Sequence, residues 1–418
     1  MPEPENLLTW SNPNVGELLV LLYERMKGTW QGNISVKKPA ELYIPMGKAE
    51  CRVKLTFDGP KLKTIQPGPA FNRREWEQIR KEIERFTLGP MIVGREFSFS
   101  GRSVIGSWKG ARSGVQICPP PANVGQFPEL SGVDDHAFIL EFPLMDAGVS
   151  AVTNHRRIRK ARDLTMLLNL FLAGGTRYTE SSPTLPNFLT NSLSPPSPTQ
   201  LEVLEWKSYD KILGDDGSGL RIPSDLDDAI CTYEVLTDSK REKFDRALFW
   251  FSTLKDIRNV SVSASFAAMV SATEAMTSRS VPHAILCPDC HRPTEHEVPG
   301  STKLFKNFLA TYAPGASASR DRDLMYDLRS EVVHGEHLVE LDREIPIMGW
   351  TPSGFKEVER YGGLWNLTRT ALQNWLKNRD RFLQEARKVC AYYHWERRNR
   401  PLWEADVDWA FAEQEFPE

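Results

Sequence analysis

The sequence contains no long apolar run: nowhere do about 18 uncharged apolar residues follow one another, the length that a membrane-spanning helix needs. Its first residues, MPEPENLLTWSNPN, lack the basic stretch followed by an apolar stretch that marks a secretory signal. Cysteine is scarce, with six in 418 residues and only Cys287 and Cys290 close together, which suits a reducing compartment better than a disulfide framework. We therefore expect a cytoplasmic protein that does not contact a membrane.

A strong charge of one sign is also missing. The net charge is -3, so the overall composition does not indicate a nucleic-acid partner, and any site for a polyanion must be local. The sequence has neither a GxxxxGK phosphate loop nor a Gly-x-Ser-x-Gly elbow, which leaves NTPase and serine-hydrolase functions without support. The composition is that of a globular chain, 40% apolar and 26% charged.

Residues 1–150 are predicted to form a mostly β module. Short runs rich in β-branched and aromatic residues, bounded by glycine and proline, predict its strands: GNISVKKPAELYIPM, CRVKLTFDG, REFSFSGRSVIGSW and HAFILEF. Residues 73–86 instead repeat apolar side chains at helical spacing, which predicts one helix inside this module.

Residues 151–239 are predicted to connect two parts of the chain. A helix with an apolar face precedes Gly174 and Gly175, and it would link or brace the β module. The segment 181–200 is rich in Ser, Pro and Thr, so we expect a linker or an exposed arm. The basic run RRIRKAR, residues 156–162, predicts a solvated face, with direct RNA contact as the alternative.

From residue 240 to residue 400 the apolar residues recur at helical spacing, which predicts a helical bundle with a small insert at 279–300 and a C-terminal tail at 401–418. The expected fold class is therefore α+β, with an N-terminal mostly β module followed by a helical bundle. A second basic cluster at residues 394–400 has aromatic neighbours that could stack on unpaired bases, or it is simply the surface end of the last helix.

The segment DLMYDLRSEVVHGEH, residues 323–337, carries an Arg and a His five positions apart in an ordinary apolar helix pattern that stops at a glycine. A helix advances about 100° per residue, so residues at offsets of three, four and seven share a face. The apolar face is made by Leu324, Leu328 and Val332. A polar stripe is made by Asp327, Ser330 and His334, where Asp327 either orients the imidazole or is solvated.

Arg329 lies about 140° around an ideal helix from His334, so the two heads meet only through the long Arg stem, a distorted last turn or a second copy of the helix. A His that titrates near neutrality can move a proton, and an Arg can hold phosphate oxygens. The pair therefore suits RNA cleavage by the ribose 2'-hydroxyl without a metal. The alternative is a structural Arg and a His favoured by the dipole at a helix C-terminus.

LMYDLRSEVVHGEH resembles the signature helix of the HEPN superfamily, in which an Arg, a small polar residue, three variable residues and a His form the ribonuclease motif. The MYDLRS..VHG form is close to the ApeA-type branch, and the resemblance covers about residues 240–400. It implies that Arg329 and His334 are the catalytic pair and that Ser330 is the polar position after the Arg. It further implies a HEPN-like bundle, metal-independent RNA cleavage, homodimers with facing motifs, and antiphage defence by abortive infection that often targets tRNA.

Because the Arg–His pair is intact, the resemblance favours an active ribonuclease over a catalytically silent HEPN module that dimerises or binds RNA. In such a protein the N-terminal module is expected to sense a trigger, for example one derived from a phage, or to restrain the nuclease. The alternative is that it extends the RNA-binding surface.

The insert contains CPDCHRPTEHE, whose two cysteines are spaced to chelate one zinc ion through their thiolates. Completing a tetrahedron would need His291 or His296, together with His283 or a distant residue. We expect Cys287, Cys290 and His296 to hold a structural zinc, since a short insert without its own core gains most from such a staple. A plain reduced loop is the alternative, and no cofactor is expected for catalysis.

Overall fold

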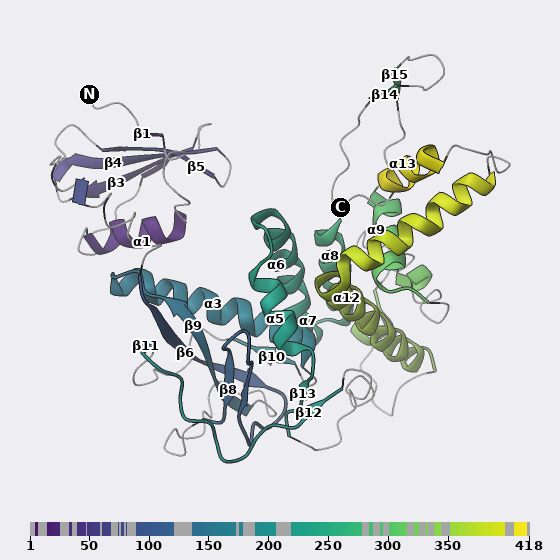
Figure 1. Ribbon diagram of the computed structural model, residues 1–418, viewed down its shortest axis with the longest axis horizontal. Helices are drawn as coiled ribbons and strands as arrows, with labels where there is room; N and C mark the ends of the chain where they lie inside the picture. The colour runs from purple at the N-terminus through teal and green to yellow at the C-terminus, as the bar shows by residue number, and fades with distance from the viewer. Residues whose placement is uncertain are drawn as a thin grey trace.

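The computed structural model shows an α+β protein, in which two antiparallel sheets precede a set of packed helices (Figure 1). The structure describes residues 5–6, 15–25, 33–35, 40–46, 48–58, 61–67, 74, 77–78, 81, 89–120, 136–172, 175–178, 189–205, 219–277, 284–286, 293–295, 301–315, 322–325, 332, 338–343, 352–397 and 405–415. Within these ranges no helix combines the length and the apolar character needed to cross a bilayer.

The first sheet has the strand order β1-β5-β4-β3-β2 and is antiparallel. Its elements are β1 (Glu5–Asn6), α1 (Val15–Arg25), β2 (Asn33–Ser35), β3 (Ala40–Met46), β4 (Lys48–Asp58) and β5 (Lys61–Pro67). Leu55 and Ile65 are fully buried and stand opposite each other in the β4–β5 register, while α1 buries Leu18 and Leu21. Apolar cross-strand pairs of this kind are what stabilises a sheet.

The second sheet is built on a ten-residue pairing of β6 (Met91–Ser100) with β9 (His136–Met145). β8 (Gln116–Cys118) joins β9, β7 (Trp108–Lys109) joins β8, and β10 (Thr176–Arg177) and β11 (Leu189–Thr190) join β6. The helix α3 (Ser150–Phe171) packs against β6 and β9. The strands predicted in residues 1–150 are therefore present in the described residues, and the second sheet also takes in β10 and β11 from beyond that range. The predicted helix at 73–86 is confirmed at its described residues, which are Arg74, Glu77, Gln78 and Lys81.

The described part of the predicted linker or exposed arm, residues 189–200, is largely exposed and lies along the second sheet. Leu189 pairs with Gly94 of β6, and the segment continues across the sheet. The Ser194 backbone N–H and hydroxyl donate to the buried Glu141 carboxylate at 2.8 and 2.5 Å, and Gln116 donates to the Ser194 carbonyl at 3.1 Å. A Ser/Pro-rich segment can thus be ordered by hydrogen bonds without burying much apolar area.

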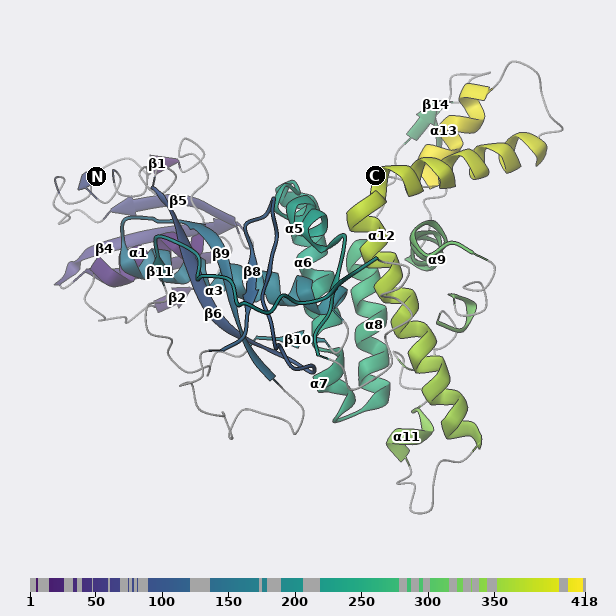
Figure 2. The same cartoon turned by 60° about the horizontal axis from the view of Figure 1, so that its bottom comes forward.

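The C-terminal part is helical, apart from two short pairs of strands (Figure 2). Its helices are α5 (Leu226–Glu234), α6 (Asp238–Ser252), α7 (Leu254–Arg258), α8 (Val262–Met276), α9 (Ser301–Tyr312), α11 (Glu340–Arg343), α12 (Pro352–Arg397) and α13 (Ala405–Glu415). Its strands are β12 (Val203–Leu204), which pairs in parallel with β13 (Ile222–Pro223), and β14 (Ala284–Leu286), which pairs with β15 (Pro293–Glu295).

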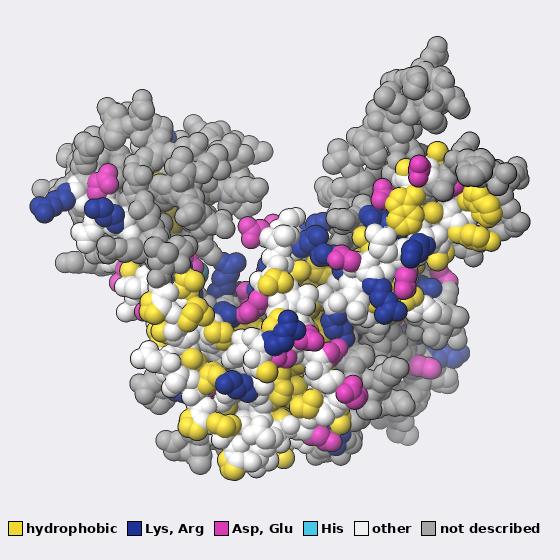
Figure 3. All heavy atoms as spheres, in the orientation of Figure 1, with side chains coloured by type: hydrophobic (Ala, Val, Ile, Leu, Met, Phe, Trp, Pro, Cys, Tyr) yellow, Lys and Arg dark blue, Asp and Glu magenta, His cyan; other side chains and the backbone are white. Residues whose placement is uncertain are grey.

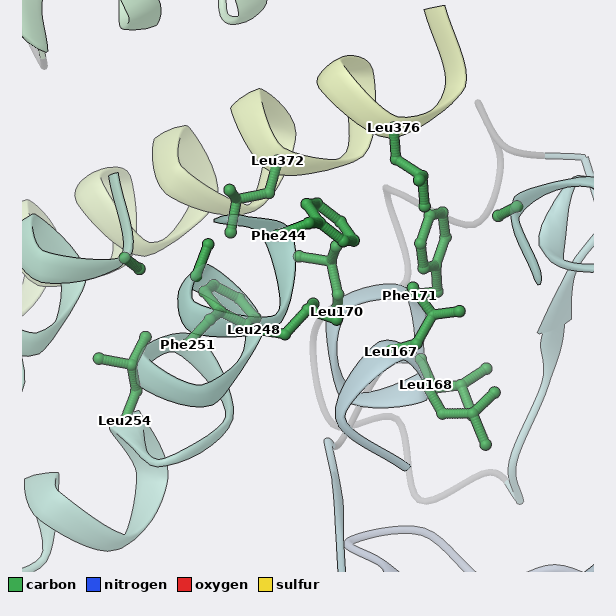
Figure 4. Close-up of a cluster of buried hydrophobic side chains, with 14 of the residues drawn as sticks. Leu167, Leu168, Leu170, Phe171, Phe244, Leu248, Phe251, Leu254, Leu372 and Leu376 are labelled. Atoms are coloured by element: carbon green, nitrogen blue, oxygen red, sulfur yellow. The ribbon is translucent and has the colours of Figure 1, made fainter. Parts of the chain in front are cut away.

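One hydrophobic cluster extends from the second sheet through α3 into the helices. Figure 4 shows side chains of α3, α6 and α12 pointing into this cluster. The helical spacing of apolar residues predicted from residue 240 is confirmed where these residues are buried, in α6, at the start of α7 and in α12: Phe244, Leu248, Phe251, Leu254, Leu364, Leu367, Ala371 and Trp375.

The buried guanidinium of Arg369 ties α12 to the end of α3. Its Nε and Nη2 donate to the carbonyls of Leu170 and Phe171 at 2.8 and 2.7 Å, and Gln373 also donates to the Leu170 carbonyl, at 2.8 Å. The last carbonyls of a helix lack intrahelical partners and carry partial negative charge. They therefore accommodate a buried cation that an apolar core could not.

Candidate functional site

The motif residues Arg329, Ser330 and His334, together with Asp327, lie outside the described residues. The structure does describe both ends of the segment that carries them. Residues 322–325 and residue 332 are helical, which confirms the predicted helix at these positions.

The N-terminal end of this segment is packed into the bundle by Met325, whose side chain is fully buried. The Thr368 hydroxyl of α12 lies 4.0 Å from the Met325 sulfur. Leu324, predicted to lie on the packed face, is only half-buried, whereas its neighbour Met325 is fully buried. Helical spacing alone could not separate the two adjacent apolar residues. Arg322 adds a hydrogen bond to the Ala313 carbonyl at 2.7 Å, just after α9.

The C-terminal end of the segment is fixed by α11 and the residues just before it. Val339 is buried, and its backbone N–H donates to the Ser263 hydroxyl at 2.9 Å. The Asp342 carboxylate accepts from the Ser261 hydroxyl at 2.8 Å and from the backbone N–H groups of Val262 and Ser263 at 2.7 Å each. Asp342 therefore caps the N-terminus of α8, where unpaired N–H groups and the helix dipole favour an anion.

The capping geometry sets the ionisation of Asp342. Burial opposes the charged form, but the hydrogen bonds from Ser263, Ser261 and Val262 outweigh it and hold the pKa of this carboxyl below its usual value. At neutral pH the cap is consequently a carboxylate. The chain between Met325 and Val339 is thus attached at one end to α12 and at the other to α8.

The predicted zinc ligands Cys287, Cys290 and His296, and the alternatives His291 and His283, also lie outside the described residues. The strands on either side of the two cysteines are described: β14 and β15 pair in the register Ala284↔Glu295 and Leu286↔Pro293. The cysteines therefore occur in the connection between two paired strands. Among the residues that the structure describes, no group of three or more His, Cys, Asp or Glu side chains could hold a metal.

The basic run at 156–162 is not the solvated face that its composition predicts. Arg157 is buried and forms an ion pair with buried Glu96 of β6, and it also donates to the Arg95 carbonyl at 3.1 Å. The guanidinium of Arg156 donates two hydrogen bonds of 2.7 Å to the carboxylate of Glu17 in α1. These cations join α3 to β6 of the second sheet and to α1, so most of the run serves internal contacts.

The remaining cations of the run approach α5 and α6. Lys160 pairs with Glu234 at 2.7 Å, and the guanidinium of Arg162 lies 6.0 Å from the centre of the Phe249 ring. Figure 3 shows cationic and acidic side chains next to one another over α5 and α6. Arg159 and Arg162 of the run are exposed, and neither makes a hydrogen bond or ion pair with another described residue.

A cavity of about 670 Å³ lies between these elements and the end of the second sheet where β6 begins and β9 ends. Four cations and four carboxylates line it: Arg156, Arg159, Lys160 and Arg241, and Glu17, Asp163, Glu234 and Asp238. Its wall also has an apolar part made by Met91, Pro143, Leu144, Met145, Leu164 and Leu236. The balance of charge makes this cavity a poor site for a polyanion.

Arg241 is the centre of a polar cluster in that cavity. Its guanidinium lies 3.4 Å from the centre of the Tyr233 ring and donates to Asp245 at 3.2 Å and to Asp163 at 3.4 Å. The Tyr233 hydroxyl donates to Asp245 at 2.7 Å. Burial and the nearby Asp245 raise the pKa of Asp163 to about 6, although Arg241 acts in the opposite direction. Burial likewise raises the pKa of Tyr233, which keeps its hydroxyl a hydrogen-bond donor.

Of the second predicted basic cluster, at 394–400, residues 394–397 complete α12 and residues 398–400 lie outside the described residues. Its described aromatic neighbours Tyr392 and Trp395 lie on the last turns of α12 with ring centres 5.8 Å apart and planes tilted by 45°. Tyr392 is 52% exposed, so one ring face is open to solvent at this end of the helix.

Comparison with known proteins finds no family model, no curated protein and no solved structure that matches this chain significantly. The resemblance to the HEPN motif therefore depends on the residues of the motif itself.

Proposed function

We propose that the protein is a metal-independent endoribonuclease of HEPN type that cleaves RNA, with tRNA as the expected substrate and antiphage defence by abortive infection as the expected role. The observation that carries the proposal is the Arg329–His334 spacing on a segment whose two ends are attached to α8 and α12. Catalysis needs its groups held in place, and attachment at both ends limits the freedom of the segment between them.

The proposed chemistry uses the RNA as its own nucleophile. His334 moves the proton of the ribose 2'-hydroxyl, or that of the leaving 5'-oxygen, because an imidazole titrates near neutral pH. Arg329 holds the phosphate oxygens through its planar fork as negative charge develops on them. Ser330 is the small polar residue next to the Arg and offers one further hydrogen-bond donor.

A homodimer is part of this proposal. On an ideal helix the two heads are separated by about 140°, so a single helix does not bring them to one phosphate. Two facing copies would place the Arg of one beside the His of the other. RNA and a second copy of the chain are accordingly the proposed partners.

Cleavage of purified tRNA in the presence of EDTA tests the proposal. The wild-type protein should cut, His334→Ala should lose about 10² to 10⁴ in rate, and Arg329→Lys should stay strongly impaired because an ammonium cannot reproduce the guanidinium fork. His136→Ala is the matched control, since His136 is an exposed histidine at the start of β9. Activity that vanishes in EDTA and returns with magnesium would contradict the mechanism.

The alternative function is a catalytically silent HEPN module that dimerises or binds RNA. It predicts RNA binding that is equal in wild type and His334→Ala, with intact RNA in both even after expression in phage-infected cells. Infection matters in this comparison because the N-terminal β module is proposed to release the nuclease in response to a phage-derived trigger.

We also propose a structural zinc at the connection of the β14–β15 hairpin. A lone two-stranded hairpin is marginally stable in water, and a metal between its ends would stabilise it. The cysteines lie between Leu286 and Pro293, which pair with each other at the connecting end of the hairpin. His296 follows Glu295, whose partner Ala284 is two residue pairs, or about 7 Å, farther from that end. This register favours His291 over His296 as a third ligand.

Metal analysis of protein purified without chelators should find about one zinc per chain, and Cys287→Ser should remove it. His291→Ala and His296→Ala compare the two candidate ligands directly. Cys231→Ser is the control, because Cys231 lies on α5 and belongs to no group of three or more potential metal ligands among the described residues. A wild-type protein with no stoichiometric zinc would contradict the proposal.

A further inference from the structure

A second cavity, of about 410 Å³, lies between the turn that joins α5 to α6 and the middle of α12. We propose that it binds a phosphate group, carried by a nucleotide or by an RNA chain. The cavity is in the range of sites that take small ligands, and it is large enough for a phosphate with its sugar. The proposal does not depend on nuclease activity, because none of the residues that line the cavity belongs to the Arg–His motif.

A break in α12 shapes one wall. Asn378 has φ -136° and ψ 26°, outside the helical region, and the helix changes direction there. Sharp kinks open the helix surface locally. The opposite wall is the turn between Val235, at the end of α5, and Thr237, at the start of α6.

The lining is strongly cationic. Four of its side chains are positively charged and one is a carboxylate: Lys240, Lys377, Arg379 and Arg381, and Asp380. In the larger cavity, by contrast, cations and carboxylates are equal in number. An excess of positive charge around a concave surface concentrates anions there, so the smaller cavity is the better anion site.

Two of the cations are held in place by the protein. Lys377 forms an ion pair with Asp225 and lies 5.6 Å from the centre of the Phe171 ring, so its charge is already neutralised within the protein. The guanidinium of Arg379 lies 5.6 Å from the centre of the Trp375 ring, with its Nε 3.1 Å from Asp380. Arg379 is thereby oriented at one edge, and its two terminal nitrogens have the geometry that grips phosphate.

The other two cations are available to a ligand. Within the described part of the chain, Lys240 makes no hydrogen bond or ion pair. Arg381 pairs at 3.2 Å with Glu385, but both side chains are well exposed, and such a pair contributes little stability. A phosphate bound in the cavity would give both side chains a stronger partner.

The first turns of α6 carry more positive charge than their carboxylates neutralise. Burial, helped by the neighbouring Arg246 and Lys240, lowers the pKa of Lys243 below its usual value. An anion near Lys240 would relieve this repulsion between like charges.

The test compares two double variants of the full-length protein. Lys240→Gln with Arg381→Gln removes the two available cations of the cavity. Lys109→Gln with Lys388→Gln removes the same charge from exposed positions on β7 and α12 that do not line the cavity. Binding is measured with a fluorescent single-stranded RNA whose 2'-hydroxyls are methylated, so that cleavage through the 2'-hydroxyl cannot occur, and with AMP and adenosine.

For an RNA chain, we expect the cavity variant to reduce the slope of log K against log salt by about 1.4, because about 0.7 is lost for each phosphate contact. With equal affinities at 1 M salt, a slope that is lower by 1.4 makes the cavity variant bind about 25-fold more weakly than the wild type at 0.1 M salt. The control variant should keep the wild-type slope. Competition by AMP but not by adenosine would identify a mononucleotide as the source of the phosphate, and absence of competition by either would identify the RNA chain.

Three outcomes would overturn the proposal. They are equal weakening in the two double variants, competition by adenosine as strong as that by AMP, and saturable binding of neither RNA nor AMP by the wild-type protein. The cleavage assay with His334→Ala is independent of all three, so failure of this site and failure of the nuclease can be told apart.

Discussion

Replacing Asp342 with Ala should loosen both the start of α8 and the segment that carries the Arg–His motif. The carboxylate accepts three hydrogen bonds, from the Ser261 hydroxyl and from the N–H groups of Val262 and Ser263. Loss of a helix cap costs about 0.5 to 2 kcal/mol, and hydrogen bonds to a charged group are at the upper end of the usual range. We therefore expect a loss of about 2 kcal/mol in the local opening free energy.

Hydrogen–deuterium exchange measures this effect where it occurs. About 2 kcal/mol corresponds to roughly 30-fold faster exchange of the amides in the first turn of α8. Asp406→Ala is the matched control, because Asp406 is an exposed aspartate in the first turn of α13. RNA cleavage by Asp342→Ala should fall as well, since α11 and Val339 would no longer be fixed to α8.

The pH dependence follows from the lowered pKa of Asp342. The stability that this carboxylate contributes is complete above its unfolded pKa of about 3.9 and is lost as the pH falls through the lower folded value. Protection of the first turn of α8 in the wild type should therefore be constant from neutral pH down to about pH 4. Unchanged exchange in Asp342→Ala, or equal acceleration in Asp406→Ala, would refute the capping role.

Three further results are expected. The pKa of Asp163 is raised to about 6, so its contribution to stability is complete below about pH 4 and is lost as the pH rises through 6. Between pH 4 and pH 7 the free energy of unfolding of the wild type, measured by chemical unfolding, should accordingly fall by about 3 kcal/mol relative to that of Asp163→Asn. The same pH dependence in both proteins would contradict the raised pKa. Glu96→Gln should cost about 3 to 5 kcal/mol in urea unfolding, because it leaves the buried Arg157 without a countercharge; a shift no larger than that of exposed Glu385→Gln would contradict this. Sedimentation at micromolar concentration should find a homodimer, and a monomer with full nuclease activity would exclude the two-copy site.

Much of the fold could be predicted from periodicity, because local pattern and burial agree in its main elements. In the predicted helical part, Phe244, Leu248 and Phe251 recur at helical spacing, and each is buried on one face of α6 in the structure. HAFILEF predicted β9 because apolar and β-favouring residues are concentrated there, and β9 is the central partner of β6 and β8.

Other features depend on partners far away in the sequence, which no local pattern shows. Arg157 reads as part of a basic surface run, yet Glu96, 61 residues earlier, draws it into the interior. Asp342 caps a helix that begins 80 residues before it. The helix α12 breaks at an asparagine, Asn378, and not at a proline or glycine, so the sequence does not predict the break. The cationic cavity beside the break could therefore not be predicted either.

The central claim, that Arg329 and His334 cleave RNA through its own 2'-hydroxyl, is tested most directly by the chemistry of the RNA ends. Sequencing of RNA termini from phage-infected cells that express the wild type or His334→Ala reports the substrate, the position of the cut and the catalytic residue together. The account predicts 2',3'-cyclic phosphate and 5'-hydroxyl ends, concentrated in the anticodon region of tRNA, in the wild type and not in His334→Ala. Ends with a 5'-phosphate, or the same ends in both strains, would contradict it.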